Sequence, residues 1–233
     1  MNIALFGYGK MGKTIERIAL ERGHTIVAKI DFDTTDYDLS SADVAIDFSI
    51  PKEAFNNITL CFKNNIPIVS GTTGWLDKYE EAVASCKTSN GAFIYASNYS
   101  LGVNLFFELN KQLAKLMRKF DVYKVSLEET HHTQKLDAPS GTAITLAEGI
   151  IEQTSKEKWS LDVTEDEKTI PIISKRIENV PGTHVTSYTS EVDEIEITHT
   201  AKNRDGFALG AVIAAEWLKD KKGVFTMKDV LGI

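Results

Sequence analysis

The clearest fold signal in the chain is Ile3-Ala4-Leu5-Phe6-Gly7-Tyr8-Gly9-Lys10-Met11-Gly12, an apolar run followed by three glycines in the pattern GxGxxG. The apolar run predicts a buried strand, and Met11, Ile15 and Ile18 recur after it at helical spacing. In such a unit the first glycine permits the tight turn, the second lets a pyrophosphate approach the backbone, and the third lets helix and strand pack closely. The helix N-terminus offers free N–H groups to the anion. We therefore predict a dinucleotide-binding unit, with an empty glycine turn as the alternative.

Asp31 stands nineteen residues beyond Gly12, at the end of a second predicted strand. A carboxylate at that place can hydrogen-bond the adenosine ribose of a dinucleotide. A carboxylate also repels a 2′-phosphate, and Phe32 rather than an arginine follows it. The sequence therefore favours NADH over NADPH, although Lys10 and Lys29 either soften that preference or are ordinary surface lysines.

The first hundred residues continue to alternate short apolar runs with helical patterns. Strands are predicted at residues 25–30, 44–48, 66–69 and 93–96. Helices are predicted to begin near Pro51 and Asp77, and Pro51 suits a first helical turn because its missing N–H group costs nothing there. Strands that alternate with helices form a parallel sheet with right-handed crossovers. We expect an α/β fold with a doubly wound parallel sheet of the Rossmann type.

The pattern changes near residue 101, where an α+β part begins. A long helix is predicted at 101–119, with a stripe of leucines at Leu105, Leu109, Leu113 and Leu116. A strand at 122–127 and a helix at 141–153 follow, and the charged residues 152–168 are interpreted as a solvated loop. Three further strands are predicted at 170–179, 183–190 and 194–200. Their alternation of apolar and polar residues is typical of an antiparallel meander.

A final helix is predicted at 206–219, and residues 224–231 form the last predicted element. We expect these elements to return to the first part of the chain. The predicted domains are therefore a dinucleotide-binding domain of residues 1–100 with 204–233, and a second domain of residues 101–203 with a mixed or antiparallel sheet.

The composition restricts the classes of function. Of 233 residues, 42% are hydrophobic and 25% are charged, and the formal net charge is −7. Binding of nucleic acid or of an anionic membrane over a broad surface is therefore not expected. No apolar run approaches the ~18 residues of a membrane span, and no secretory signal is recognised. Cys61 and Cys86 lack the spacing of metal ligands and are interpreted as small buried hydrophobes, which fits a reducing cytoplasm.

Two polar loops directly follow predicted strands. They are Gly71-Thr72-Thr73-Gly74 and Ala96-Ser97-Asn98-Tyr99. Open α/β sheets bind ligands at the carboxyl ends of their strands. Each loop is therefore either part of a ligand site or a capped turn, since Thr, Ser and Asn favour turn positions.

The densest group of reactive side chains is Glu129-Thr130-His131-His132-Thr133-Gln134-Lys135-Leu136-Asp137-Ala138-Pro139-Ser140-Gly141-Thr142. Its imidazoles and ammonium group suit the protonation of a carbon or nitrogen atom, or the binding of carboxylates. Ser140 is expected to cap a helix whose first N–H groups, at Gly141 and Thr142, face an anionic oxygen. No cysteine or third histidine nearby has metal spacing, so no zinc site is expected. The alternative is a solvated polar loop that ends in a capped helix.

Glu129-x-His131-His132-x-x-Lys135-x-Asp137-Ala138-Pro139-Ser140-Gly141-Thr142-Ala143 resembles the signature of the 4-hydroxy-tetrahydrodipicolinate reductase family, also called dihydrodipicolinate reductase. The resemblance extends to several other stretches and covers essentially the whole chain. These stretches are residues 44–51, 71–74, 96–104, 196–204 and 207–218.

The resemblance implies a two-domain reductase that is usually a homotetramer, joined through the sheets of the second, substrate-binding and oligomerisation domain. The family transfers hydride from NADH or NADPH to C4 of a cyclic dicarboxylate made from pyruvate and aspartate semialdehyde. Water is lost, and the product, tetrahydrodipicolinate, lies on the diaminopimelate route to lysine. No metal is implied, and the location is cytoplasmic.

The resemblance also implies roles for individual residues. His131 and Lys135 match the catalytic acid–base positions, although the sequence does not say which of them delivers which proton. The substrate dicarboxylate is expected to contact His132, Ser140, Gly141 and Thr142. The cofactor is expected to contact Gly7, Tyr8, Gly9, Lys10, Met11, Gly12, Asp31, Gly71, Thr72, Thr73, Ala96, Ser97, Asn98 and Tyr99.

The sequence departs from the family pattern in a few places. The family often has one more residue in the glycine turn, Lys10 replaces a usual arginine, and the region before Asp43 is short.

Two other classes of function are alternatives. A dinucleotide-sensing regulator would not need the His-His-Lys loop, and an aspartate semialdehyde dehydrogenase would need a nucleophilic cysteine beside a histidine.

Overall fold

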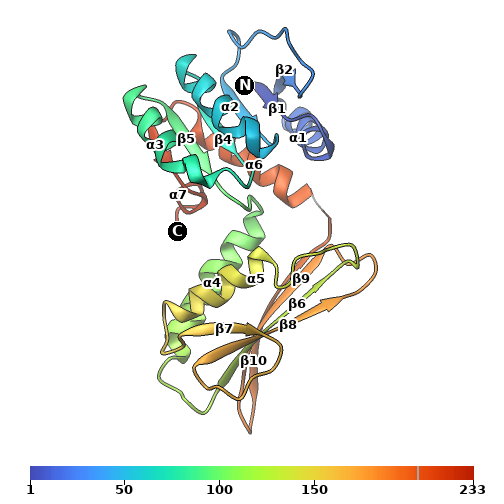
Figure 1. Ribbon diagram of the computed structural model, residues 1–233, viewed down its shortest axis with the longest axis vertical. Helices are drawn as coiled ribbons and strands as arrows, with labels where there is room; N and C mark the ends of the chain where they lie inside the picture. The colour runs from blue at the N-terminus through green and yellow to red at the C-terminus, as the bar shows by residue number, and fades with distance from the viewer. Residues whose placement is uncertain (204) are drawn as a thin grey trace. The chain divides into compact units, whose positions relative to one another are not determined.

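The computed structural model describes residues 1–203 and 205–233 (Figure 1). Arg204, the last residue of the 196–204 motif, lies outside the described residues. The chain divides into two compact units. Unit 1 is Met1–Leu101 with Asp205–Ile233, and unit 2 is Gly102–Arg204. Among the described residues, no helix has the length and apolar character needed to cross a membrane.

Unit 1 is built on a six-stranded sheet with the order β11-β5-β4-β3-β1-β2, and every neighbouring pair is parallel. The strands are β1 (Asn2–Phe6), β2 (Thr25–Ile30), β3 (Val44–Asp47), β4 (Ile68–Ser70), β5 (Ala92–Tyr95) and β11 (Gly223–Phe225). The predicted Rossmann-type parallel sheet is confirmed. The connection from β2 to β3 contains no helix or strand among its described residues, as expected for a shortened region before Asp43.

Helices cover both faces of this sheet (Figure 1). The helices are α1 (Lys10–Glu21), α2 (Pro51–Lys63), α3 (Tyr79–Thr88), α6 (Asp205–Leu218) and α7 (Met227–Leu231), with a 3₁₀ turn at Leu76–Lys78. One apolar core joins α1 and α6 to the sheet, and a second joins α2 and α3 to the opposite face. Cys61 and Cys86 are free thiols buried in the second core, as expected for small hydrophobes.

The end of the chain completes this unit. Strand β11 pairs in parallel with β5 at the edge of the sheet. Helix α6 is rich in small residues, and a Cβ atom added at Gly210 would lie 1.7 Å from the Tyr99 carbonyl oxygen. The small residues therefore let α6 lie directly on the backbone that leaves β5.

Unit 2 consists of a five-stranded mixed sheet with two helices on one face (Figure 1). Its elements are α4 (Leu101–Met117), β6 (Lys124–His131), α5 (Gly141–Ile151), β7 (Lys158–Leu161), β8 (Thr169–Arg176), β9 (Gly182–Thr189) and β10 (Glu194–Ala201). The inward side chains of β6 and β8, including Leu127 and Ile172, pack with Phe106 of α4 and Leu146 of α5. The outward side chains that alternate with them, such as Ser126 and Ile173, stay only half-buried.

Two expectations for unit 2 were wrong. The strand order is β10-β9-β6-β8-β7, so β8 and β9 are not neighbours in a meander. Strand β6 lies between them, antiparallel to β9 and parallel to β8. The charged segment 152–168, expected to be a loop, contains β7, which pairs in parallel with β8. Apolar alternation identifies the buried face of a strand but not its neighbours, and β7 is an edge strand of only 4 residues inside a charged segment.

The predicted leucine stripe of α4 points away from the core. Leu105, Leu109 and Leu116 are exposed, whereas the helix buries Val103, Phe106, Asn110, Ala114 and Met117. The apolar surface of this helix is therefore wider than the core of unit 2 requires.

Candidate active site

The glycine turn after β1 has the packing that its three glycines predict. Gly7 has a φ of +85°, and its N–H group donates to the Ile30 carbonyl oxygen at 2.7 Å. A Cβ atom at Gly7 would lie 2.2 Å from the Phe48 carbonyl oxygen, and one at Gly12 would lie 2.2 Å from the Gly7 carbonyl oxygen. A Cβ atom at Gly9 would meet no described atom within 4 Å. The outer glycines allow close packing, and the middle one faces open space where a phosphate group fits.

Helix α1 begins at Lys10, so the N–H groups of Lys10, Met11 and Gly12 belong to its first turn and have no acceptor within the helix. Beside them, the Tyr8 hydroxyl donates to Glu16. Lys29 forms an ion pair with Glu16 at 2.6 Å and lies over the Tyr8 ring. Hydrogen bonds from Lys29 and Tyr8 lower the pKa of Glu16. Lys29 is therefore already paired, which limits its use as a partner for a 2′-phosphate.

Asp31 directly follows β2, at the same edge of the sheet as the glycine turn. Phe6 and Ile30 are register partners at the ends of β1 and β2, which places the turn and Asp31 side by side. The Asp31 carboxylate accepts the Phe32 N–H group at 3.0 Å, and the Phe32 side chain is 88% exposed. This carboxylate beside an open glycine turn fits the ribose of a dinucleotide.

Asp47, at the end of β3, holds the loops after β3 and β4. Its carboxylate is fully buried and accepts hydrogen bonds from Ser49 (2.6 Å), Asn57 (3.0 Å), Ser70 (2.9 Å) and Thr72 (2.8 Å). Burial raises the pKa of Asp47, and these four donors oppose the rise because they favour the charged carboxylate. The sequence analysis gave this residue no role.

The loops after β4 and β5 divide into buried and exposed members. The Thr72 hydroxyl is committed to Asp47, whereas Thr73 is exposed. Tyr99 is buried, and its hydroxyl donates to the Ser70 carbonyl oxygen at 2.8 Å. Ser97 is exposed. Ala96 and Asn98 are half-buried, and the Asn98 side chain accepts the Ser100 N–H group at 2.9 Å. The exposed side chains of these loops are therefore those of Thr73 and Ser97, and any cofactor contact by Tyr99 would use its backbone.

In unit 2, the alternation of β6 turns Glu129 and His131 toward the helices, where both are buried. The loop 132–140 then leads to α5, which Ser140 caps by accepting the Ala143 N–H group at 3.2 Å. The predicted helix cap is confirmed. A Cβ atom at Gly141 would meet no described atom within 4 Å, and Gly141 is exposed. The first N–H groups of α5 therefore stand at an open surface suited to a carboxylate.

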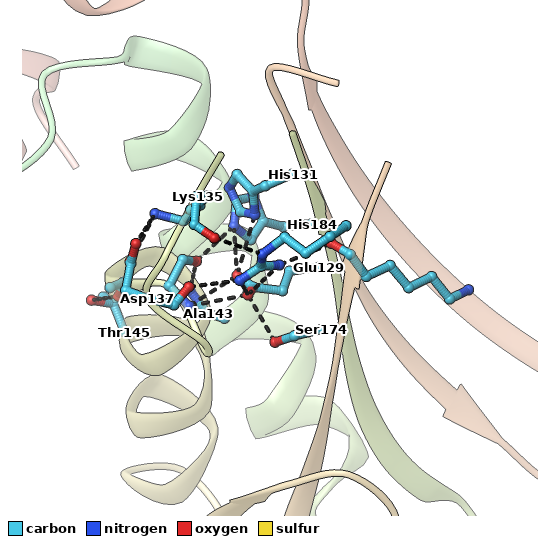
Figure 2. Close-up of polar contacts among 12 residues, drawn as sticks. Glu129, His131, Lys135, Asp137, Ala143, Thr145, Ser174 and His184 are labelled. Carbon is cyan, nitrogen blue, oxygen red and sulfur yellow. Dashed lines mark hydrogen bonds and ion pairs between the residues drawn. The ribbon is translucent and has the colours of Figure 1, made fainter. Parts of the chain in front are cut away.

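Glu129 is the centre of a buried polar network (Figure 2). Its carboxylate accepts the Ser140 N–H group at 3.0 Å and the Ser174 hydroxyl at 2.8 Å, and the Arg176 guanidinium lies 3.4 Å away. Burial by itself raises the pKa of Glu129, but the hydrogen bonds from Ser140 and Ser174 hold that pKa below its ordinary value. The carboxylate is therefore charged at neutral pH.

Two imidazoles meet this carboxylate from neighbouring strands. Nδ1 of His131 lies 3.6 Å, and Nε2 of His184 on β9 lies 3.7 Å, from Oε2 of Glu129. The two rings stand edge to face, with centroids 5.0 Å apart, and His184 also contacts the Ser140 hydroxyl at 3.2 Å. Burial lowers the pKa of His131 and lowers that of His184 to about 4. Both rings are therefore neutral at neutral pH.

Lys135 lies on the loop beside these groups, with its ammonium group held by the Asp137 carboxylate at 2.7 Å (Figure 2). This hydrogen bond lowers the pKa of Asp137. Arg176 fastens the same loop, because its guanidinium donates to the carbonyl oxygens of Lys135 (3.3 Å) and Asp137 (2.6 Å). His132 is half-buried at the start of the loop. The structure thus brings the predicted acid–base and substrate-binding residues together around one strand end and one helix N-terminus.

Glu129, His131 and His184 present possible metal-ligand atoms that all lie within 4.8 Å of one another. Sequence spacing did not indicate this group, because His184 is distant in the chain. The Arg176 guanidinium, bonded to the same carboxylate, already supplies a positive charge there. We therefore assign no cation to the group.

Ser174, Arg176 and His184 belong to this site, although no sequence motif indicated them. Each lies at an inward position of its strand. Ile170 and Ile172 are the inward residues before Ser174 on β8, and His184 is an inward residue of β9. A polar residue at an inward strand position was the available signal, since buried polar groups need partners.

Comparison with known proteins agrees with this arrangement. Residues 32–99 match the family model described as dihydrodipicolinate reductase, N-terminus, and residues 102–231 match dihydrodipicolinate reductase, C-terminus. The chain is 64% identical to the 4-hydroxy-tetrahydrodipicolinate reductase of Christiangramia forsetii, covering 99% of this chain and 98% of the relative. It is 32% identical to that of Neisseria meningitidis serogroup B, covering 94% of this chain and 84% of the relative.

Solved structures give the same result. A dipicolinate-bound dihydrodipicolinate reductase from Paenisporosarcina sp. TG-14 has a TM-score of 0.78 and 25% identity, and the match covers 97% of both chains. A probable dehydrogenase from Thermotoga maritima has a TM-score of 0.60 at 10% identity, over 99% of this chain and 92% of that one, which shows a shared fold alone. The chain therefore belongs to the dihydrodipicolinate reductase family.

Proposed function

We propose that the protein is a 4-hydroxy-tetrahydrodipicolinate reductase, which uses NADH or NADPH to reduce C4 of a cyclic dicarboxylate with loss of water. The product would be tetrahydrodipicolinate, on the diaminopimelate route to lysine. The observation that carries this proposal is the 64% identity over 99% of the chain to a reductase of that name. The buried Glu129–His131 pair, with Lys135 and the start of α5 beside it, supplies the chemistry that the reaction needs.

Unit 2 would bind the substrate and supply protons. The N–H groups of Gly141 and Thr142, with His132, would hold a carboxylate, because a helix N-terminus favours an anion. Ser140 would act by capping the helix, since its hydroxyl and its N–H group are already bonded inside the unit. His131 and Lys135 are the candidate proton donors. Lys135 would exchange its bond to Asp137 for one to the substrate.

Unit 1 would bind the dinucleotide, which supplies the hydride when bound. The open surface at Gly9 and the start of α1 suit the pyrophosphate, and Asp31 suits the ribose. Thr73 and Ser97 are the exposed side chains on the neighbouring strand ends. We infer a preference for NADH, because Asp31 repels a 2′-phosphate and Lys29 is already paired with Glu16. No metal is part of the proposal.

We also propose that residues 101–203 act as the substrate-binding and oligomerisation domain of a homotetramer. The outward face of the unit 2 sheet is only half-buried, and the leucine stripe of α4 is exposed. Both surfaces could be covered by a second copy of the chain. Sedimentation at several concentrations tests this proposal, and a cytoplasmic location is tested by cell fractionation.

The activity is tested by the loss of NADH absorbance with substrate made in situ from pyruvate and aspartate semialdehyde by the preceding synthase. We expect turnover with NADH and weaker turnover with NADPH. Binding of NADH without turnover would instead favour a dinucleotide-sensing regulator. No turnover with either cofactor would contradict the proposal.

A further inference from the structure

Glu129 is not one of the proposed acid–base or substrate-binding residues, yet it is fully buried and contacts three other elements of unit 2. It lies on β6 and meets the start of α5 through Ser140, β8 through Ser174 and Arg176, and β9 through His184. A buried carboxylate is costly unless its oxygens have partners. These partners hold the Glu129 carboxylate in one place, so its negative charge acts on a neighbouring side chain from a fixed position.

The group next to it is His131. Nδ1 of that ring lies 3.6 Å from Oε2 of Glu129, too far for a hydrogen bond, and it is buried without a hydrogen-bond partner among the described residues. The other nitrogen, Nε2, lies toward Gly182, where a Cβ atom would come within 3.1 Å of it. The edge of the His184 ring packs on His131 and leaves it little freedom to turn. The geometry thus presents one nitrogen to the buried charge and leaves the other to exchange protons.

His184 links this ring to the start of α5. Its Nε2 atom is 3.2 Å from the Ser140 hydroxyl, which in turn caps the helix by accepting the Ala143 N–H group. The Ser140 N–H group returns to Glu129. One closed circuit of contacts therefore connects the candidate proton donor with the candidate carboxylate-binding helix N-terminus (Figure 2).

We propose that Glu129, assisted by His184, is a positioning residue that orients His131 and stabilises its protonated form during turnover. The proposal rests on the proposed reductase function. In the resting state the Arg176 guanidinium balances the Glu129 carboxylate. When His131 takes a proton from solvent at Nε2, the imidazolium forms 3.6 Å from that carboxylate in a buried site, where the attraction is strong. Transfer of the same proton to the reduced substrate returns the ring to its neutral form.

The protonation of His131 depends on all the charged and titratable groups around it. They are Glu129 on its own strand, Arg176 on β8, His184 on β9, and Lys135 and Asp137 on the loop. His199 of β10 is the cross-strand partner of His184 and also lowers the pKa of that ring. Glu129 and Asp137 favour the protonated ring, whereas the two cations disfavour it. Removing the Glu129 charge removes an interaction that favours the protonated ring, while the two cations still disfavour it. The pKa of His131 would therefore fall, and the ring would protonate only at lower pH.

The test compares E129Q with E157Q in steady-state assays across pH. Glu157 lies in unit 2 just before β7, in an exposed ion pair with Lys168, so E157Q is the control for loss of one carboxylate charge. Partners that orient metal-ligating imidazoles contribute ~10–100-fold in activity, and we take the same range for His131. We expect kcat of E129Q to fall by about that factor, KM for the dicarboxylate to change less than about threefold, and the pH limb due to His131 to move to lower pH. E157Q should match the parent in all three.

A second pair separates orientation from simple filling of space. H184Q keeps a polar atom that can bond the Ser140 hydroxyl, whereas H184L does not. We expect H184Q to retain more of the parent kcat than H184L. Equal losses in both variants, or a lower melting temperature of E129Q with an unmoved pH profile, would show a merely structural role and overturn the proposal.

A measurement on the parent protein covers the case in which E129Q does not fold. Nitrogen-15 NMR of the imidazoles reports which nitrogen of His131 carries the proton at neutral pH. We expect a proton on Nδ1, with Nε2 as the titrating atom, and a proton on Nε2 would overturn the proposal. This measurement needs no turnover. If the positioning role of Glu129 is wrong, the NMR result shows it. If the proposed function is wrong, the parent protein shows no reductase activity, so the two failures are distinguishable.

Discussion

Replacing Asp47 with alanine tests whether its buried carboxylate holds the loops that are proposed to bind the cofactor. On the Oδ1 side, Ser49 and Asn57 would keep each other as partners, since they lie 3.1 Å apart. On the Oδ2 side, the Ser70 and Thr72 hydroxyls would lose a buried charged acceptor. Each lost bond of that kind costs ~1–3 kcal/mol, and relief from burying the carboxylate offsets part of the sum. We expect the free energy of unfolding to fall by about 3 kcal/mol.

Urea unfolding followed by circular dichroism measures this change, and D47N is the control. Asparagine keeps one oxygen acceptor, and the Ser70 and Thr72 hydroxyls can accept from its amide group, so we expect a loss of only about 1 kcal/mol. KM for NADH should rise in D47A, because Thr72 anchors the turn that carries Thr73. A D47A protein within about 0.5 kcal/mol of the parent would refute the reasoning.

Three further outcomes are expected. G210A should lose at least ~2 kcal/mol in urea unfolding, because its Cβ atom would lie 1.7 Å from a backbone carbonyl oxygen, whereas G206A on the same helix, with 3.6 Å to its nearest neighbour, should not be destabilised. D31S should raise the NADPH/NADH ratio of kcat/KM by about tenfold or more, and an unchanged ratio would remove Asp31 from the cofactor site. The hydrogen bonds from Arg22 and His24 lower the pKa of Glu216 below its ordinary value, although burial opposes this shift. The group should therefore contribute stability above the ordinary carboxyl pKa and lose it as the pH falls through the lowered pKa. E216Q should flatten the acid limb of the melting temperature, and an unaltered limb would contradict the assignment.

Sequence patterns predicted unit 1 well because each signal there is local. Examples are the strand before Gly7, the helix that contains Gly12 and the proline at the start of α2. Each of these signals depends only on residues that are close together in the chain. The loops at the strand ends then meet at one edge because parallel strands all end there. What the sequence did not indicate is that Thr72 and Tyr99 face inward, since that depends on Asp47 and Ser70 from other strands.

In unit 2 the sequence predicted the elements better than their partners. The polar loop before Ser140 and the helix cap were predicted, because their residues adjoin in the chain, but β6 continues to His131 where the sequence predicted that the strand ends at residue 127. The position of β6 between β8 and β9 was not predicted. The contacts of Ser174 and His184 with Glu129 were therefore not predicted either, because strand pairing alone brings them together. Long-range pairing depends on which strands bury complementary polar groups, and a single sequence does not display that.

The most direct test of the central claim is kcat of H131A and K135A beside the parent, with NADH and substrate made in situ. Acid–base groups contribute ~10²–10⁴-fold to rates, so we expect each variant to lose at least ~10²-fold in kcat while still binding NADH. Values of kcat within about threefold of the parent for both variants would contradict the assignment of the proton-transfer site to the 129–142 segment.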